Sequence, residues 1–263
     1  MNKVLINEIE CIGCGACKKD CVSGVIEMSE GKARVLSNQC IKCGHCVAIC
    51  PVNAVTISDY DSSEVLELIE QPDPISPEGL ITSIKSLRTI RHFKKGDIDD
   101  HVIEEIIEAG RYSATAGNRQ NVRYIVVRDD IDRIEEPVLK RIKVLQKIAK
   151  AVSKFIKLPY DISSIPFKKG FLFKDAPVLI LTVSESVLDA SLASRSMELM
   201  MNAKGLGGLY VGFFTALANS HKKVRKHLGL SRKEKIVTCL AIGIPDVKYH
   251  RTVPRKKANI VYK

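Results

Sequence analysis

Eight of the nine cysteines lie in two runs that share the spacing C-x2-C-x2-C-x3-C. The first run supplies Cys11, Cys14, Cys17 and Cys21, and the second supplies Cys40, Cys43, Cys46 and Cys50. Thiolates at this spacing hold a pair of [4Fe-4S] clusters, and the fourth cysteine of each run binds the cluster of the other run. The sequence therefore predicts two electron-carrying centres. Cluster I would be held by Cys11, Cys14, Cys17 and Cys50, and cluster II by Cys40, Cys43, Cys46 and Cys21.

A second set of candidate functional residues lies further along the chain. In SLRTIRHF, two guanidinium groups and one hydroxyl, from Arg88, Arg91 and Thr89, lie within four residues. Such a group suits a phosphate dianion or an electron-rich ring. In SATAGNRQN, small residues let the backbone approach a ligand, and the amide of Asn118 can donate and accept. Arg255, in VPRKK, adds positive charge. Together these segments suit a flavin.

Motifs for other chemistries are missing from the sequence or are wrongly placed. No P-loop lysine motif, HExxH motif or GxSxG motif occurs, and the six histidines are scattered. The glycine-rich stretch 205–208 follows an expected helix and precedes an expected strand, which is the reverse of the dinucleotide-binding fingerprint. We therefore expect no nicotinamide site of the Rossmann type.

The composition along the chain predicts two domains joined by a linker. The cysteine region forms an expected cluster domain over residues 1–58, and an acidic segment with three prolines follows at 59–80. Ser76-Pro77-Glu78 in that segment is typical of a helix start, with serine as the N-cap. Residues 81–263 are long enough to bury a core of their own.

The elements that must position the downstream residues alternate between helices and strands. Helices are predicted near 77–87, 99–112, 134–157, 187–204 and 215–228, the last two ending at Gly205 and Gly229. Strands are predicted at 122–127, 177–183, 208–213 and 236–243. These apolar strands suit a sheet covered on both faces. The expected fold class is α+β, a two-cluster domain followed by a three-layer α/β/α sandwich. Residues 244–263 are expected to run as an arm, over the domain or onto a second subunit.

The formal net charge of +11 would by itself suggest a nucleic-acid or anionic-membrane partner. Two clusters at roughly −2 each and a flavin phosphate at roughly −2 would reduce it to about +5. The basic segments 140–157 and 221–227 lack interleaved aromatics, so nucleic acid is not expected. They are interpreted as solvated helix faces or, alternatively, as a docking surface for an acidic redox partner. No apolar stretch of about 18 residues and no signal peptide occur, so we expect no membrane span and a cytoplasmic location.

These segments, in this order, resemble the FMN-dependent nitroreductases, in the subset with an N-terminal two-cluster ferredoxin domain. The resemblance rests on an RRSxRxF-like start at 87–93, a PSxxNxQPW-like loop at 114–122, a GLG segment at 205–212, and a GYP-like turn at 243–245 followed by Arg255. It covers about residues 85–263, and the ferredoxin resemblance covers 1–58. Asn121 and Val122 replace the Pro and Trp of the loop, and Leu87 replaces the first arginine.

The resemblance implies a cofactor, a partner and residue roles. Arg88 and Thr89 would hold the FMN phosphate and ribityl chain, and Arg91 would lie toward the N1 and O2 edge of the ring. The other implied FMN contacts are Thr115, Ala116 and Asn118 from the partner subunit of a homodimer, Gly207, Gly208 and Gly212 near N5, and Arg255 at the phosphate. No catalytic side chain is assigned, because the flavin itself would supply the reactivity.

Two functions remain open at this point, together with a purely structural role in which FMN is absent and the clusters only stabilise an interface. In the first, electrons enter through the clusters, collect on FMN and pass to an organic acceptor such as a nitro compound, a quinone or an activated alkene. In the second, the chain is an electron-transfer or redox-sensing module that serves a protein partner such as a ferredoxin or flavodoxin. The resemblance covers several chemistries on one scaffold, so it does not choose the acceptor.

Overall fold

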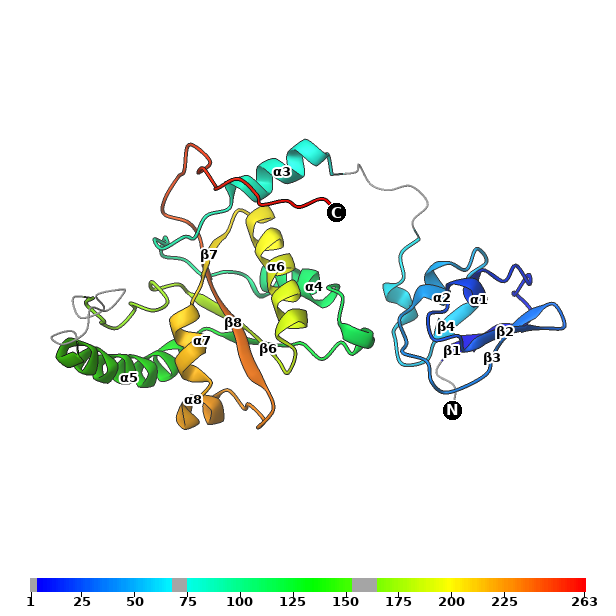
Figure 1. Ribbon diagram of the computed structural model, residues 1–263, viewed down its shortest axis with the longest axis horizontal. Helices are drawn as coiled ribbons and strands as arrows, with labels where there is room; N and C mark the ends of the chain where they lie inside the picture. The colour runs from blue at the N-terminus through cyan, green and yellow to red at the C-terminus, as the bar shows by residue number, and fades with distance from the viewer. Residues whose placement is uncertain (1–3, 68–74, 153–164) are drawn as a thin grey trace. The chain divides into compact units, whose positions relative to one another are not determined.

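The computed structural model describes residues 4–67, 75–152 and 165–263. The chain divides into two compact units (Figure 1). The first comprises Met1–Pro74 and Thr115–Arg119, and the second comprises Ile75–Ala114 and Gln120–Lys263.

The first unit is a small internally repeated fold. Its elements are β1 (Val4–Ile6), α1 (Ala16–Asp20), β2 (Ile26–Ser29), β3 (Lys32–Val35), α2 (His45–Ala48), β4 (Val55–Ile57) and two single 3-10 turns, η1 (Ser62–Glu64) and η2 (Ala116–Asn118). β3, α2 and β4 repeat β1, α1 and β2 at the same offset as the cysteines. β1 pairs with β4 and β2 pairs with β3, both antiparallel. Each pair therefore joins a strand of one half to a strand of the other half.

The second unit is built on a four-stranded antiparallel sheet of order β5-β6-β8-β7. Its strands are β5 (Arg123–Val127), β6 (Val178–Ser184), β7 (Gly207–Tyr210) and β8 (Lys235–Gly243). Its helices are α3 (Pro77–Ser86), α4 (Asp100–Arg111), α5 (Ile131–Val152), α6 (Val187–Ala203), α7 (Gly212–Ala218) and α8 (Lys222–His227).

Alternate residues of the central strand β6 face opposite layers, as the pleat of a strand requires. Val178 and Ile180 belong to a buried cluster with residues of α4 and α6, including Met197. Leu179 and Leu181 belong to another cluster, with residues of α5, α7 and α8. The sheet is therefore covered on both faces, and the expected three-layer sandwich is confirmed.

Most element predictions are confirmed, and two are corrected. Ser76 Oγ accepts from the Gly79 amide at 3.0 Å, so α3 has the expected N-cap. The helix predicted at 215–228 is wrong, because α7 and α8 are separate. Asn219 causes the break, since its side-chain amide exchanges two 2.8 Å hydrogen bonds with the backbone of Ile236 in β8. The strand predicted at 208–213 ends at Tyr210, and α7 begins at Gly212. The C-terminal residues of the helix predicted at 134–157 lie outside the described residues.

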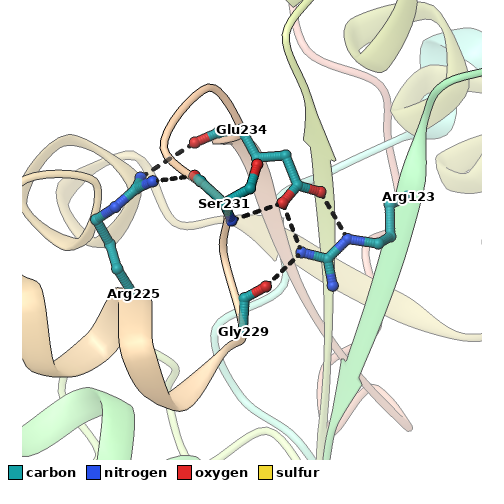
Figure 2. A network of polar contacts seen from close by, with 5 residues as sticks. All are labelled: Arg123, Arg225, Gly229, Ser231 and Glu234. Atoms are coloured by element: carbon teal, nitrogen blue, oxygen red, sulfur yellow. Dashed lines mark hydrogen bonds and ion pairs between the residues drawn. The ribbon is translucent and has the colours of Figure 1, made fainter.

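A polar network fastens the edge strand β5 to the turn between α8 and β8 (Figure 2). Arg123 donates to both carboxylate oxygens of Glu234, at 2.8 and 3.1 Å, and also to the carbonyl of Gly229. The Ser231 amide donates to Glu234 at 2.8 Å, and Arg225 donates to the Glu234 carbonyl at 3.1 Å. The hydrogen bonds from Arg123 and then from Ser231 lower the pKa of the Glu234 carboxyl to about 2.

We expect Glu234→Gln to destabilise the second unit by about 1 to 2 kcal/mol at pH 7, after a discount for the solvent around the half-exposed Arg123. Because the folded-state pKa is depressed, the stabilisation is present above the unfolded pKa of about 4.5 and is lost as pH falls toward 2. The difference in unfolding free energy between wild type and variant should therefore become smaller below about pH 5. Urea unfolding followed by circular dichroism measures it. Glu136→Gln, which removes an exposed carboxylate of α5, is the control, and parallel pH curves for Glu234→Gln and wild type would contradict the prediction.

Candidate cluster and flavin sites

One pocket of the first unit is lined by Cys11, Cys14, Cys17 and Cys50, together with Gly15 and apolar residues such as Ile6, Ile12 and Val55. These are the four cysteines expected to bind cluster I, three from the first run and the last from the second. We call this ligand arrangement crossed, because the fourth cysteine of each run binds the cluster of the other run. In the described residues, no three His, Cys, Asp or Glu side chains are arranged to hold a single metal ion. Four cysteines around a cubane need not converge in that way, because each binds a different iron of the cluster.

The backbone around the cysteines repeats together with their spacing. Gly13 and Lys42 both adopt left-handed conformations, with φ of 72° and 55°, as do Gly15 and Gly44 before α1 and α2, with φ of 71° and 81°. A side chain at position 13 would also collide with the Gly31 carbonyl oxygen, 2.1 Å from an ideal Cβ. The loops are thus shaped to wrap around the cysteines at close range.

Backbone amides are directed at the cysteine sulfurs. Lys42 N lies 3.3 Å from Cys40 Sγ, and Ala54 N lies 3.2 Å from Cys50 Sγ. Hydrogen bonds from the amides of Ala33 and Gly13 lower the pKa of the Cys11 thiol. Donors of this kind stabilise thiolates, and in clusters they tune the potential. The residues present therefore fit iron–sulfur clusters.

Burial has the opposite effect on the cysteines inside the two short helices. It raises the pKa of Cys17 and raises the pKa of Cys46 to about 11. A buried thiol must release its proton before it can ligate iron, so cluster binding at these positions is linked to proton release. The clusters then supply part of the folding free energy of this small unit.

Two of the residues expected at the flavin phosphate and ribityl chain, Arg88 and Thr89, follow the end of α3. Arg88 donates through Nη1 to the Lys85 carbonyl at 3.0 Å and to the Leu87 carbonyl. Its Nε and Nη2 are buried and have no hydrogen-bond partner within the described part of the chain. Buried donors of this kind are almost always hydrogen-bonded, so an anion such as a phosphate is the natural partner of Arg88.

The residues after Arg88 contact the glycine segment. Thr89 forms a β-bridge with Gly208, and Ile90 N donates to the Gly208 carbonyl at 2.9 Å. The structure therefore brings the Arg88 segment and the glycine segment together.

The packing of the chain itself accounts for two of the glycines. A Cβ at Gly207 would lie 2.4 Å from Ile90, and one at Gly208 would lie 2.8 Å from the Ala241 carbonyl oxygen. A Cβ at Gly212, the first residue of α7, meets nothing within 4 Å. Position 207 thus needs glycine so that the Arg88 segment can approach the sheet, and position 208 needs it because β8 and α6 lie close to its backbone, whether or not the two positions also face a ligand.

Sequence reasoning missed Lys174, which lies near Arg91. A side chain at Gly243 would touch both Phe93 and Pro177, so the segments that carry Arg91 and Lys174 come together at that end of the sheet. Burial and then the charge of Arg91 lower the pKa of Lys174, whose ammonium lies 3.7 Å from the centre of the Phe171 ring. Two adjacent cations favour binding of an anion. A lone lysine ahead of an apolar strand gave no signal in the sequence.

Four further expected FMN contacts belong to other segments of the chain. Thr115, Ala116 and Asn118 group with the first unit, where the side-chain amide of Asn118 donates to the carbonyls of Lys42 at 2.8 Å and Ile41 at 3.2 Å. Arg255 lies in the exposed stretch that follows β8, which has no regular secondary structure. No helix among the described residues is both long and apolar enough to cross a membrane.

Comparisons with known proteins agree with this division of the chain. A model of the nitroreductase family matches residues 84–244, and a model described as a 4Fe-4S dicluster domain matches residues 3–51. An NADPH-flavin oxidoreductase of Vibrio harveyi is 26% identical over 181 residues, which are 69% of this chain and 71% of that protein. A ferredoxin of Pyrobaculum islandicum is 40% identical over 55 residues, 20% of this chain and 51% of that ferredoxin.

The fold of the second unit also has solved counterparts. The crystal structure of an FMN-bound nitroreductase from Bacteroides fragilis matches with a TM-score of 0.54 and 20% identity, over 70% of this chain and 98% of that chain. The family match covers more than half of the present sequence. The chain therefore belongs to the nitroreductase family, as an FMN-dependent oxidoreductase with a [4Fe-4S] dicluster ferredoxin domain at its N-terminus.

Proposed function

We propose that this protein passes electrons from its two [4Fe-4S] clusters to FMN and then to an organic acceptor, such as a nitro compound, a quinone or an activated alkene. The observation that carries the proposal is the union in one chain of a crossed cysteine pocket with a flavin fold whose Arg88 keeps two buried donors without a partner. Bound FMN supplies the ability to take up electrons singly and to release them in pairs.

We assign the residues of the chain to the two clusters and to FMN as follows. Cys11, Cys14, Cys17 and Cys50 hold cluster I, and Cys40, Cys43, Cys46 and Cys21 hold cluster II. Arg88, Thr89 and Arg255 bind the phosphate side of FMN, and Arg91 lies at the pyrimidine edge of the ring. Thr115, Ala116 and Asn118 act across a homodimer interface, and Gly207, Gly208 and Gly212 line the ring. We place the protein in the cytoplasm and its domain boundaries at 1–58, 59–80 and 81–263.

The test compares electron donors in the reconstituted holoprotein. Reduced ferredoxin or flavodoxin should support steady reduction of a nitroaromatic compound or a quinone, and the rate should fall by at least tenfold when both clusters are removed by Cys14→Ala with Cys43→Ala. NADPH, the donor in the name of the Vibrio harveyi relative, is the comparison. Rapid turnover with NADPH that is unchanged by loss of the clusters would contradict the proposed path.

A second candidate function is delivery of electrons to, or their receipt from, an acidic protein partner. The exposed lysines of α5 and α8 favour it, because these two helices pack against each other and both are rich in lysine. These lysines are Lys140, Lys143, Lys147, Lys150, Lys222, Lys223 and Lys226. Stoichiometric recovery of a ferredoxin or flavodoxin with the holoprotein, without any turnover of small acceptors, would favour this function over the first.

A further inference from the structure

We propose that the two clusters differ in reduction potential, and that the charge of Lys32 makes cluster I the higher-potential centre. This inference rests on the two-cluster part of the proposed function and on its ligand assignment. It does not depend on the acceptor, on FMN or on the placement of one unit relative to the other.

Lys32 brings a positive charge directly to the cluster I ligands. It is the first residue of β3, and its partly buried Nζ donates to the Cys11 carbonyl at 2.5 Å. No carboxylate in the described part of the chain lies within ion-pair distance of this ammonium. The nearby carboxylate of Glu8 is engaged by Arg34, at 3.3 Å. Cluster I therefore has an adjacent cation that is not neutralised by an ion pair.

The lysine beside cluster II has a different environment. The amide of Lys42 donates to Cys40 Sγ at 3.3 Å, so this residue belongs to the loop that wraps the second cysteine run. Its ammonium forms an ion pair with Asp59 at 2.5 Å, and both side chains are partly shielded, with exposed fractions of 28% and 35%. The pair is neutral as a unit. The two halves of the internal repeat therefore have the same cysteine spacing but differ in the net charge beside their clusters.

A difference in potential follows from this difference in charge. Reduction adds one electron to an already anionic cluster, so an uncompensated cation nearby favours the reduced state, while a neutral ion pair has little effect. Potentials of clusters held by identical ligands are set by net charge, hydrogen bonds to the sulfurs and exposure. The first electron to enter the protein should accordingly reside on cluster I.

The experiment is a mediated redox titration of the full-length holoprotein, followed by electron paramagnetic resonance. Lys32→Gln keeps a donor for the Cys11 carbonyl and removes the charge. We expect it to shift the electron distribution between the clusters about tenfold away from cluster I, which corresponds to about 59 mV for one electron. Lys32→Arg keeps the positive charge and should give the wild-type potential of cluster I. Asp59→Asn should instead raise the potential of cluster II. Lys32→Gln and Asp59→Asn should therefore each reduce the difference in potential between the two clusters.

Cluster identity is assigned with Cys14→Ser and Cys43→Ser, which alter cluster I and cluster II respectively. The signal of the singly reduced protein should change in the first variant and persist in the second. Lys222→Gln, which removes an exposed lysine of the second unit, is the matched control and should move neither potential. The inference is overturned if the signal persists in Cys14→Ser, or if Lys32→Gln moves no potential, or if Lys32→Arg shifts it as far as Lys32→Gln does. No acceptor is present in the titration, so a wrong acceptor assignment would leave this result standing.

Discussion

Replacing Cys50 with alanine is expected to remove or convert cluster I while cluster II survives, although Cys50 belongs to the second cysteine run. The reason is the pocket that Cys50 shares with Cys11, Cys14 and Cys17. Loss of one thiolate leaves a cubane with three ligands, and about half of the iron, roughly four atoms of about eight, should be lost or become labile. Because cluster binding also stabilises the unit, the variant should unfold more readily.

Iron analysis together with electron paramagnetic resonance of the reduced protein measures this effect. The residual signal of Cys50→Ala should match that of Cys14→Ala and differ from that of Cys46→Ala. Cys239→Ala is the matched control, because the ninth cysteine is buried in β8 of the second unit and should hold no iron. If Cys50→Ala instead gives the residual signal of Cys46→Ala, the crossed assignment is wrong.

Arg88→Ala is expected to weaken FMN binding by roughly 10- to 150-fold. Its Nε and Nη2 are buried donors without partners in the described residues, and a hydrogen bond between charged groups contributes about 1.5 to 3 kcal/mol. Arg88→Lys should recover only part of the affinity, because an ammonium cannot reproduce the paired donors of a guanidinium. Fluorescence titration of the flavin-free protein gives the dissociation constants.

Riboflavin separates a phosphate contact from a general effect on the site. It carries the same ring without the phosphate, so its affinity should change little in Arg88→Ala. Arg111→Ala, which removes an exposed arginine paired with Glu108 on α4, is the control for an arginine distant in sequence from the site. An equal loss of FMN and riboflavin affinity would contradict the assignment of Arg88 to the phosphate.

The cluster unit could be predicted almost completely from the sequence, whereas the flavin site could not. Cysteine ligands can be recognised from their residue type and spacing, and the glycines between them indicate the turns that the loops need. Most helices and strands of the second unit were also predictable, because β6 and β8 are largely buried and mostly apolar. The break at Asn219 was not, because it depends on hydrogen bonds to a strand 17 residues away.

The flavin residues were harder because each is chemically ordinary. An arginine or a glycine in isolation is more often structural than functional, and only the three-dimensional arrangement distinguishes the two. The partnerless guanidinium of Arg88 and the proximity of Lys174 to Arg91 result from tertiary packing between segments far apart in sequence. Local patterns carry no information about such pairs. The same applies to Asp59, whose neutralising contact with Lys42 depends on how the chain returns after β4.

The crossed pocket also constrains when the protein can mature during its synthesis. Cluster I needs Cys50 as well as the three cysteines that emerge first, and both strand pairs join residues of the two halves. A nascent chain that ends before Cys50 therefore offers an incomplete ligand set for cluster I and lacks β4 as the partner of β1. Loading of cluster I must therefore wait until Cys50 has left the ribosome, whereas the four expected ligands of cluster II are all present once Cys46 has emerged. Premature termination anywhere before residue 50 should yield a product without an intact cluster I.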